Sequence, residues 1–238
     1  VVNLVGILYE ESGRQNFKRV HDSGASHVAT VAAKAGVRKL IQLSAVGADP
    51  GSSSDYARTK AAGESNVKKV FPDAVVIRPS IVFGPEDRFF NTFASIAQFS
   101  PALPLIGGGK TRFVPIYVGD VAKAIVKALE LNNSEPKIYE LGGPENYSFR
   151  GLMEILLEEI KKKRFLIPIP FGVAKFQSYF LQMMPNPLLT PDQVEMLKYN
   201  NIASGEYPTL EDLGISGKTI QSILPKYIYR FRAGGQFG

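Results

Sequence analysis

The chain has 238 residues, 45% of them hydrophobic, and a formal net charge of +6, which suits one large α/β domain or one domain with an appended lobe. Because it has no cysteine, disulfides and thiolate metal sites are excluded, and with two histidines far from paired carboxylates we expect no metal site. No run approaches about eighteen consecutive apolar residues, so we expect no membrane-spanning helix. The moderate positive charge favours acidic partners or an anionic surface, and no basic patch interleaved with aromatic residues indicates nucleic acid.

Four short apolar runs predict buried parallel strands, because strands covered on both faces carry apolar residues throughout. They lie at residues 1–7, 39–44, 74–78 and 137–141. Helical patterns separate them, and strands that alternate with helices predict a parallel sheet wound in βαβ units. The fold class expected from the first half of the chain is therefore α/β, with a Rossmann-like doubly wound sheet.

Two helical patterns lie between the first three strands. The first is expected at residues 16–35, with one apolar stripe turned inward and Gly36 ending the helix. The second is expected at residues 56–70, with Asp55 as its cap. The inner stripe expected for the first helix consists of Phe17, Val20, His27, Val28, Val31 and Ala35.

The second half of the chain is more varied. A helix is expected at residues 86–99, followed by a loop at residues 101–110, whose Gly107–Gly109 tip fits a mobile hairpin or a phosphate cradle. Further helices are expected at 121–131 and, with Ser148 as cap, at 148–163.

A change of composition follows the helix at 148–163. Four consecutive cations at 161–164 precede a helix-length segment, 173–184, that is crowded with Phe, Tyr, Leu and Met. Thr190 is expected to cap a further helix. A basic cluster beside an aromatic helix fits an anionic membrane surface or a large partner, and equally fits side chains that cover the lobe itself.

Ligands of open α/β sheets bind beyond the carboxyl ends of the strands, and Gly6, Ser44 and Pro79 stand at such ends. Tyr56 and Lys60 are four residues apart, so their side chains share one face of the predicted helix. An ammonium beside a phenol lowers the pKa of the phenol, and such a tyrosine could exchange a proton with a carbonyl or alcohol at neutral pH. Ser44 could hydrogen-bond the same oxygen. The pair alone also fits a tyrosine packed on a lysine stem.

This arrangement resembles the Ser, Tyr-x-x-x-Lys active site of the short-chain dehydrogenase/reductase superfamily. Over nearly the whole chain the pattern most closely resembles an extended or atypical member of that superfamily, the alpha subcomplex subunit 9 family of respiratory complex I, with its bacterial relatives. The stretches that carry the resemblance are residues 1–6, 44–48, 56–64, 78–91, 115–122 and 211–215.

The resemblance implies an NADP(H) cofactor, with NAD(H) as the other candidate. Gly6 would approach its adenosine side, and Lys60 would bond the nicotinamide ribose. His21 stands where related enzymes often carry Asn, which puts a proton relay in doubt. The implied cofactor-binding residues are Gly6, Ser44, Tyr56, Lys60, Pro79, Ser80 and Ile81, and the implied catalytic residues, if the protein is active, are Ser44, Tyr56 and Lys60.

The resemblance also implies a division of the chain and a missing part. Residues 1–147 would form an NAD(P)-binding core, with 86–117 partly in a smaller lobe, and residues 148–238 a mostly helical docking lobe. The family's Gly-rich phosphate loop and the residue that distinguishes NAD from NADP would lie before Val1. The strand at 1–7 would then expose an apolar edge, with which we expect further strands to pair in the intact protein.

Two functions follow from these expectations. The first is an accessory subunit or assembly factor of NADH:ubiquinone oxidoreductase that holds NADP(H) as a structural ligand and contacts other subunits of that complex. It would lie on the matrix side of the mitochondrial inner membrane, or on the cytoplasmic face of the inner membrane in a bacterium. The alternative is a free-standing NAD(P)-dependent oxidoreductase or nucleotide-sugar epimerase that uses Ser44, Tyr56 and Lys60.

Overall fold

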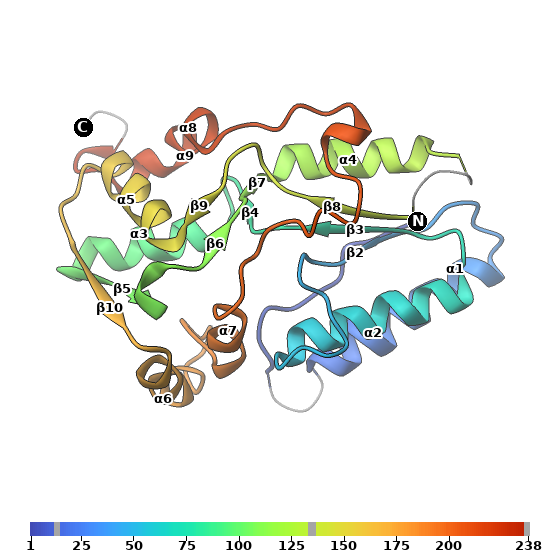
Figure 1. The fold of residues 1–238 in the computed structure, drawn as a ribbon, viewed down its shortest axis with the longest axis horizontal. Helices are drawn as coiled ribbons and strands as arrows, with labels where there is room; N and C mark the ends of the chain where they lie inside the picture. The colour runs from blue at the N-terminus through green and yellow to red at the C-terminus, as the bar shows by residue number, and fades with distance from the viewer. Residues whose placement is uncertain (12–14, 133–136, 236–238) are drawn as a thin grey trace. The chain divides into compact units, whose positions relative to one another are not determined.

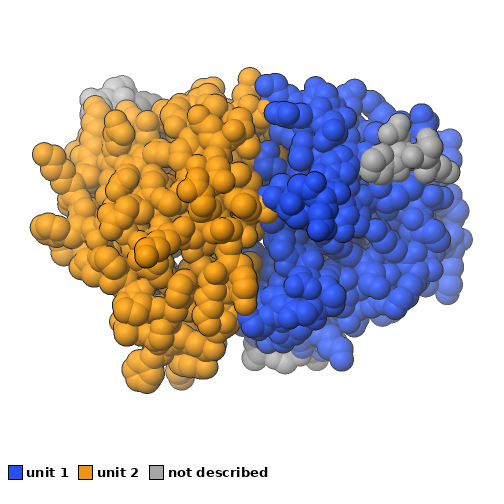
Figure 2. Space-filling model, in the orientation of Figure 1, with its two compact units in different colours: residues 1–80, 121–142, 203–216 blue, residues 81–120, 143–202, 217–238 orange. Residues whose placement is uncertain are grey.

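The computed structural model describes residues 1–11, 15–132 and 137–235. The chain forms two compact units, each assembled from three stretches of the sequence (Figure 2). The first unit contains residues 1–80, 121–142 and 203–216, and the second contains residues 81–120, 143–202 and 217–238. The division into domains at residues 147 and 148 stays a prediction.

A four-stranded parallel sheet lies at the centre of the first unit, in the order β1-β2-β3-β8. Its strands are β1 (Val2–Asn3), β2 (Ile41–Leu43), β3 (Val75–Pro79) and β8 (Ile138–Leu141), and its helices are α1 (Ala25–Lys34), α2 (Asp55–Val70) and α4 (Val118–Glu130). Figure 1 shows α1 and α2 on one face of the sheet and α4 on the other. This arrangement confirms the α/β fold with a parallel sheet.

The first strand is shorter than the seven residues expected, because β1 ends at Asn3. The buried Asn3 side chain donates to Gln42 Oε1 at 2.8 Å, and its own oxygen accepts the Val5 N–H at 3.2 Å. These bonds turn the chain out of the sheet, so Leu4 and Val5 are exposed. Gly6 consequently lies beyond the end of the strand, whereas the sequence placed it within the strand, near its end.

The buried face of the first helix also differs from the expected stripe. A π-helical stretch (Lys18–Gly24) runs directly into α1, and its buried face is made mainly of small residues that lie close to α2. A Cβ on Gly63 of α2 would overlap the carbonyl oxygen of His21. His27, Val31 and Ala35, expected inside, are exposed. The buried residues along this face are Phe17, His21, Ala25, Ala29 and Ala32.

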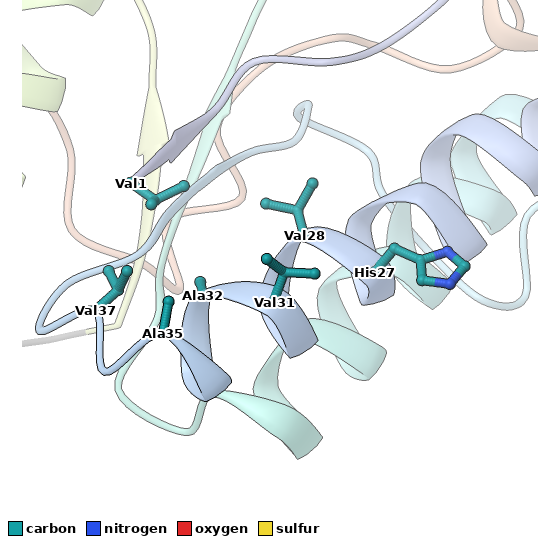
Figure 3. A pocket seen from close by; sticks show the side chains of 7 residues that line it. All are labelled: Val1, His27, Val28, Val31, Ala32, Ala35 and Val37. Carbon is teal, nitrogen blue, oxygen red and sulfur yellow. The ribbon is translucent and has the colours of Figure 1, made fainter.

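The valine side of α1 instead lines a shallow apolar groove of about 390 Å³ beside the start of β1. Figure 3 shows Val28 and Val31 on the side of α1 that faces Val1. Among the described residues β1 pairs only with β2. The pairing of further strands with this edge in the intact protein stays a prediction.

Short polar side chains cap the N-termini of several helices. Ser54, rather than Asp55, caps α2, since its hydroxyl accepts the Ala57 N–H; Asp55 is the first helical residue and pairs with Arg58. Ser148 caps α5 (Phe149–Glu159) as expected. Thr190 likewise caps α7 (Pro191–Met196), and with Gln193 it forms a reciprocal capping box.

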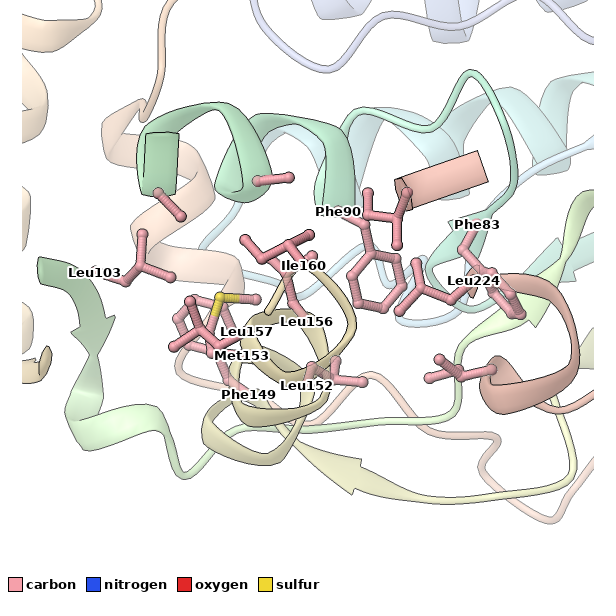
Figure 4. Packing of buried hydrophobic residues seen from close by; sticks show 14 of the residues in the cluster. Phe83, Phe90, Leu103, Phe149, Leu152, Met153, Leu156, Leu157, Ile160 and Leu224 are labelled. Carbon is pink, nitrogen blue, oxygen red and sulfur yellow. The ribbon is translucent and has the colours of Figure 1, made fainter. Parts of the chain in front are cut away.

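The second unit has an aromatic and aliphatic core of its own (Figure 4). Helices α3 (Phe89–Phe99), α5, α8 (Ile220–Ile223) and α9 (Pro225–Ile228) supply most of it. The rings of Phe93 and Phe149 meet edge to face, with centroids 5.4 Å apart, a geometry that stabilises beyond the burial of area.

The expected loop at residues 101–110 contains a strand. Strand β5 (Ala102–Ile106) pairs in parallel with β10 (Phe165–Ile169), over sixty residues later in the chain. The Gly107–Gly109 turn that follows is therefore no hairpin tip, because the partner of β5 comes from elsewhere. The Phe171 ring at the start of α6 (Phe171–Leu181) fills the space in which Gly107 would carry a Cβ.

Two short strand pairs complete the second unit. They are β4 (Val82–Phe83) with β7 (Ile116–Tyr117), in parallel, and β6 (Arg112–Phe113) with β9 (Tyr147–Ser148), antiparallel. Short 3-10 turns lie at Gly107–Gly109 and Tyr229–Phe231 in the second unit and at Glu211–Leu213 in the first.

No helix within the described ranges has both the length and the apolar character needed to cross a bilayer.

Candidate functional site

Ser44 follows β2 directly and is fixed by the neighbouring strand. Its backbone N–H donates to the carbonyl oxygen of Ile77 in β3 at 2.7 Å. The residue is 4% exposed, and its Oγ has no hydrogen-bond partner among the described residues. Since buried hydroxyls nearly always have a partner, this oxygen is a strong candidate for contact with a ligand.

Tyr56 and Lys60 lie one turn apart on α2, as their spacing predicted. The Ser54 cap begins the helix just before Tyr56, which sets the direction of both side chains. Lys60 Nζ lies 5.8 Å from the centroid of the Tyr56 ring and donates to the carbonyl oxygen of Leu43 at 3.4 Å. The ammonium thus reaches from α2 to the end of β2, next to Ser44 in the sequence.

Lys60 is an unusually buried cation, at 7% exposure. Burial lowers its pKa to about 8, and the carboxylate of Glu64, one turn further along α2, opposes that shift. The ammonium therefore remains mostly protonated at pH 7, although its hydrogen bond within the described chain is long. Such a group has donors to spare for a hydroxyl or an anion.

His21, which the family resemblance had singled out, contacts the same site. Its Nε2 accepts the Ile7 N–H at 3.0 Å, so the ring proton belongs on Nδ1, which faces Thr59 Oγ1 at 3.1 Å. Burial, and then the nearby Lys60 charge, lower the pKa of His21 to about 4. The imidazole is therefore neutral at physiological pH. Its ring meets the Tyr56 ring edge to face, with centroids 5.2 Å apart.

Gly6 belongs to this site as well. A Cβ on Gly6 would lie 3.2 Å from Lys60 Nζ and 3.7 Å from His21 Nε2. A side chain at this position would thus press on the two buried nitrogens. The absence of a Cβ leaves the backbone of this turn close to the ammonium, which is the kind of approach that a bound ligand requires.

The other three expected residues follow β3. Pro79 ends the strand, and its carbonyl oxygen accepts the Val46 N–H at 3.0 Å, beside the loop that carries Ser44. Ser80 is buried and donates its N–H to Leu141 in β8. Ile81 is the first residue of the second unit. The structure therefore brings Gly6, Ser44, Tyr56, Lys60, Pro79 and Ser80 to the carboxyl edge of one sheet.

A buried charge cluster that no sequence pattern predicted lies behind Lys60. Arg78 donates through Nε and Nη2 to both oxygens of Glu64, at 2.9 and 2.7 Å, and through Nη1 to Glu140 at 3.2 Å. Burial lowers the pKa of Arg78, but the hydrogen bonds to Glu64 and Glu140 and the charge of Glu64 together raise it above its ordinary value, so the guanidinium stays charged. The guanidinium carbon of Arg78 lies 5.0 Å from the centroid of the Tyr207 ring.

The residues present fit a nicotinamide nucleotide. Lys60 can donate to ribose hydroxyls, the Gly6 turn allows close approach, and the Ser44 hydroxyl has no hydrogen-bond partner in the described part of the chain. Phenol, ammonium and hydroxyl near one strand end are also the groups that move a proton to or from an alcohol. The expected lowering of the Tyr56 pKa stays a prediction.

Sequence comparison finds relatives named as subunits of a respiratory enzyme. The chain is 34% identical over 99% of its length to the mitochondrial NADH dehydrogenase [ubiquinone] 1 alpha subcomplex subunit 9 of Arabidopsis thaliana, covering 61% of that protein. It is 35% identical over 90% of its length to the protein of the same name from Mus musculus, covering 57%. The chain thus spans about three fifths of the length of these relatives.

Structure comparison finds sugar-nucleotide enzymes of the same fold. A dTDP-glucose 4,6-dehydratase from Streptomyces venezuelae, solved with NAD bound, superposes with a TM-score of 0.66 at 17% identity, over 94% of this chain and 71% of that one. A UDP-glucuronic acid 4-epimerase from Bacillus cereus, also with NAD, gives 0.62 at 18% identity, over 94% and 73%. At this identity the likeness shows the fold.

The family itself is shown by a direct match. Residues 2–142 match the NAD dependent epimerase/dehydratase family, and this range includes every candidate site residue named above. The match agrees with the parallel sheet, with the position of the site at its carboxyl edge and with a nicotinamide nucleotide as the ligand. The chain belongs to the NAD dependent epimerase/dehydratase family.

Proposed function

We propose that the protein is an accessory subunit or assembly factor of NADH:ubiquinone oxidoreductase that holds NADP(H) mainly as a structural ligand. The observation that carries this proposal is the identity of 29 to 35% with proteins named as subunits of that enzyme, over 90 to 100% of this chain. Other subunits of the complex are then its partners. Its place is the matrix side of the mitochondrial inner membrane, or the cytoplasmic face of the inner membrane if the source is bacterial.

The nucleotide-binding part of the proposal is supported by the buried groups of the site. The Lys60 ammonium donates to the nicotinamide ribose, and the Gly6 turn lies against the adenosine side. Pro79, Ser80 and Ile81 line the nicotinamide. The hydrogen bond from Lys60 to the Leu43 carbonyl oxygen is long, at 3.4 Å, so the ammonium gains a better acceptor when the ribose is bound. NADP(H) is the proposed form of the nucleotide, and NAD(H) is the competing candidate.

A second candidate function is supported by the complete Ser44, Tyr56 and Lys60 set. In an oxidoreductase or epimerase, Tyr56 would act as a phenolate that takes the hydroxyl proton of the substrate and becomes a neutral phenol. Lys60 would stabilise the phenolate before this transfer and contact the ribose, while Ser44 Oγ would donate to the substrate oxygen. The nicotinamide ring would accept the hydride in such a reaction. The observation that favours this candidate is the buried Ser44 Oγ, which lacks a partner among the described residues.

One purification separates the two functions. The full-length protein is tagged in its own cells and isolated from solubilised membranes, and the accompanying proteins and nucleotides are identified by mass spectrometry. The accessory-subunit proposal expects NADH:ubiquinone oxidoreductase subunits and bound NADP(H). A protein that elutes alone and oxidises NADPH with a sugar nucleotide or similar carbonyl substrate would refute it and support the second candidate.

A further inference from the structure

Helix α6 of the second unit carries its bulky side chains on the outside. Its buried residues are small: Ala174 and Ser178, one turn apart, face inward. Phe176 and Phe180 point outward, at 67% and 61% exposure, and Met183 just beyond the helix is 81% exposed. At 100° per residue these outward positions cover one continuous face together with Val173, Tyr179 and Met184. The helix has an apolar face turned away from its own unit.

The apolar surface continues beyond α6. Phe165 and Ile167 are two residues apart in β10, so their side chains lie on the same side of the strand, and both are exposed, Phe165 at 77%. Phe99 at the end of α3 is 93% exposed, and the Phe165 N–H donates to the carbonyl oxygen of Pro101, two residues after Phe99. Exposed apolar residues on several neighbouring elements indicate an interaction surface.

The segment that forms this surface carries little charge, and a run of cations precedes it. The 27 residues from 165 to 191 contain a single charged side chain, Lys175, and Lys175 and Lys198 share the one carboxylate of Glu195 at 2.6 and 2.7 Å. Four consecutive cations, residues 161–164, lead into β10. Three of them are lysines, a residue type that is depleted in protein–protein interfaces but favoured beside anionic lipid headgroups.

We propose that the outer face of α6 and β10 binds the surface of an anionic lipid bilayer. Aromatic and methionine side chains would enter the boundary between headgroups and acyl chains, while Lys161, Lys162 and Lys163 contact lipid phosphates. This surface lies in the second unit and does not use the nucleotide site, so its failure and that of the proposed function are distinguishable. A protein partner with an apolar helix is the competing occupant, and the lysine-rich border argues against it.

The test is cosedimentation of the full-length protein with vesicles of phosphatidylcholine alone and with an equal mixture of phosphatidylcholine and phosphatidylglycerol. The expected result is binding to the anionic vesicles with much weaker binding to the neutral ones. A Phe176→Ser, Phe180→Ser variant should lose most of the binding. Replacing Lys161, Lys162 and Lys163 by Gln should weaken it about a hundredfold, since each lysine near the surface contributes about fivefold.

Matched controls lie in the first unit. The first control, Val126→Ser, removes an exposed apolar side chain from α4. The second replaces three exposed cations, Lys18, Arg19 and Lys34, by Gln. Both controls should bind vesicles like the unaltered protein. The Phe176→Ser, Phe180→Ser variant should retain its nucleotide content and melting temperature. Absence of binding to anionic vesicles, equal loss in the controls, or self-association or capture of a protein partner through Phe176 and Phe180 without vesicle binding would each overturn the proposal.

Discussion

Lys60→Met should make the nucleotide-free protein more stable and should remove most of the stabilisation that NADPH provides. Burial lowers the pKa of Lys60 from its ordinary value of 10.5 to about 8, and each pKa unit corresponds to about 1.4 kcal/mol. Keeping the ammonium charged in the folded state therefore costs about 3 kcal/mol at neutral pH. Methionine keeps the apolar stem of the side chain and removes the charge, so it relieves this cost.

The destabilising effect of the buried Lys60 charge should depend on pH. Because the folded-state pKa is lowered, the cost is fully present below pH 8 and disappears as the pH rises from about 8 to 10.5, where the unfolded chain still holds the proton. The stability of the unaltered protein should rise toward that of Lys60→Met across this window. Urea unfolding of both nucleotide-free proteins, followed by circular dichroism at several pH values, measures the difference directly.

NADPH at about a hundredfold above the dissociation constant should narrow the stability difference between the two proteins to about 1–2 kcal/mol. Loss of a charge-assisted bond to the ribose is worth about 1.5–3 kcal/mol, which is roughly ten- to hundredfold in affinity. At a nucleotide concentration about a hundredfold above the dissociation constant of the unaltered protein, that protein gains about 2.7 kcal/mol and the variant much less. A Lys60→Met protein that is destabilised without nucleotide, or that gains as much from NADPH, would refute the reasoning.

Three further changes test other contacts. Tyr56→Phe keeps the ring and removes the acid; bound nucleotide, measured by mass spectrometry, should stay almost unchanged, and a large loss would contradict a structural ligand. Gly63→Ala should lower the unfolding free energy by several kcal/mol in urea, because the added Cβ overlaps the His21 carbonyl oxygen; an unchanged midpoint would disprove the close helix contact. Arg78→Met leaves two buried carboxylates without their cation and should cost about 3–5 kcal/mol, with part recovered at acidic pH; equal loss at all pH values would argue against the ion cluster.

The local parts of the site could be predicted from the sequence. Tyr56 and Lys60 share a face because of helical spacing, and Ser44 directly follows a strand because an apolar run ends there. The same reasoning located three of the four sheet strands closely. Each of these features depends on residues close in the sequence, for which periodicity is a direct signal.

Other features depend on distant contacts. The bonds of Asn3 to Gln42 and of His21 to Ile7 form only after the sheet and helices pack, so neither the early end of β1 nor the role of His21 had a local signal. The small inner face of α1 reversed the expected stripe, because Gly63 allows a close approach that large apolar residues would prevent. Likewise, β5 has its partner more than sixty residues away.

The amount of NADP(H) bound per copy of the protein, isolated from membranes together with its partners, tests the central claim most directly. The account predicts close to one NADP(H) per copy in the unaltered and Tyr56→Phe proteins and a large loss in Lys60→Met. Isolation in the same complex without any nicotinamide nucleotide, or with the same content in Lys60→Met, would contradict it.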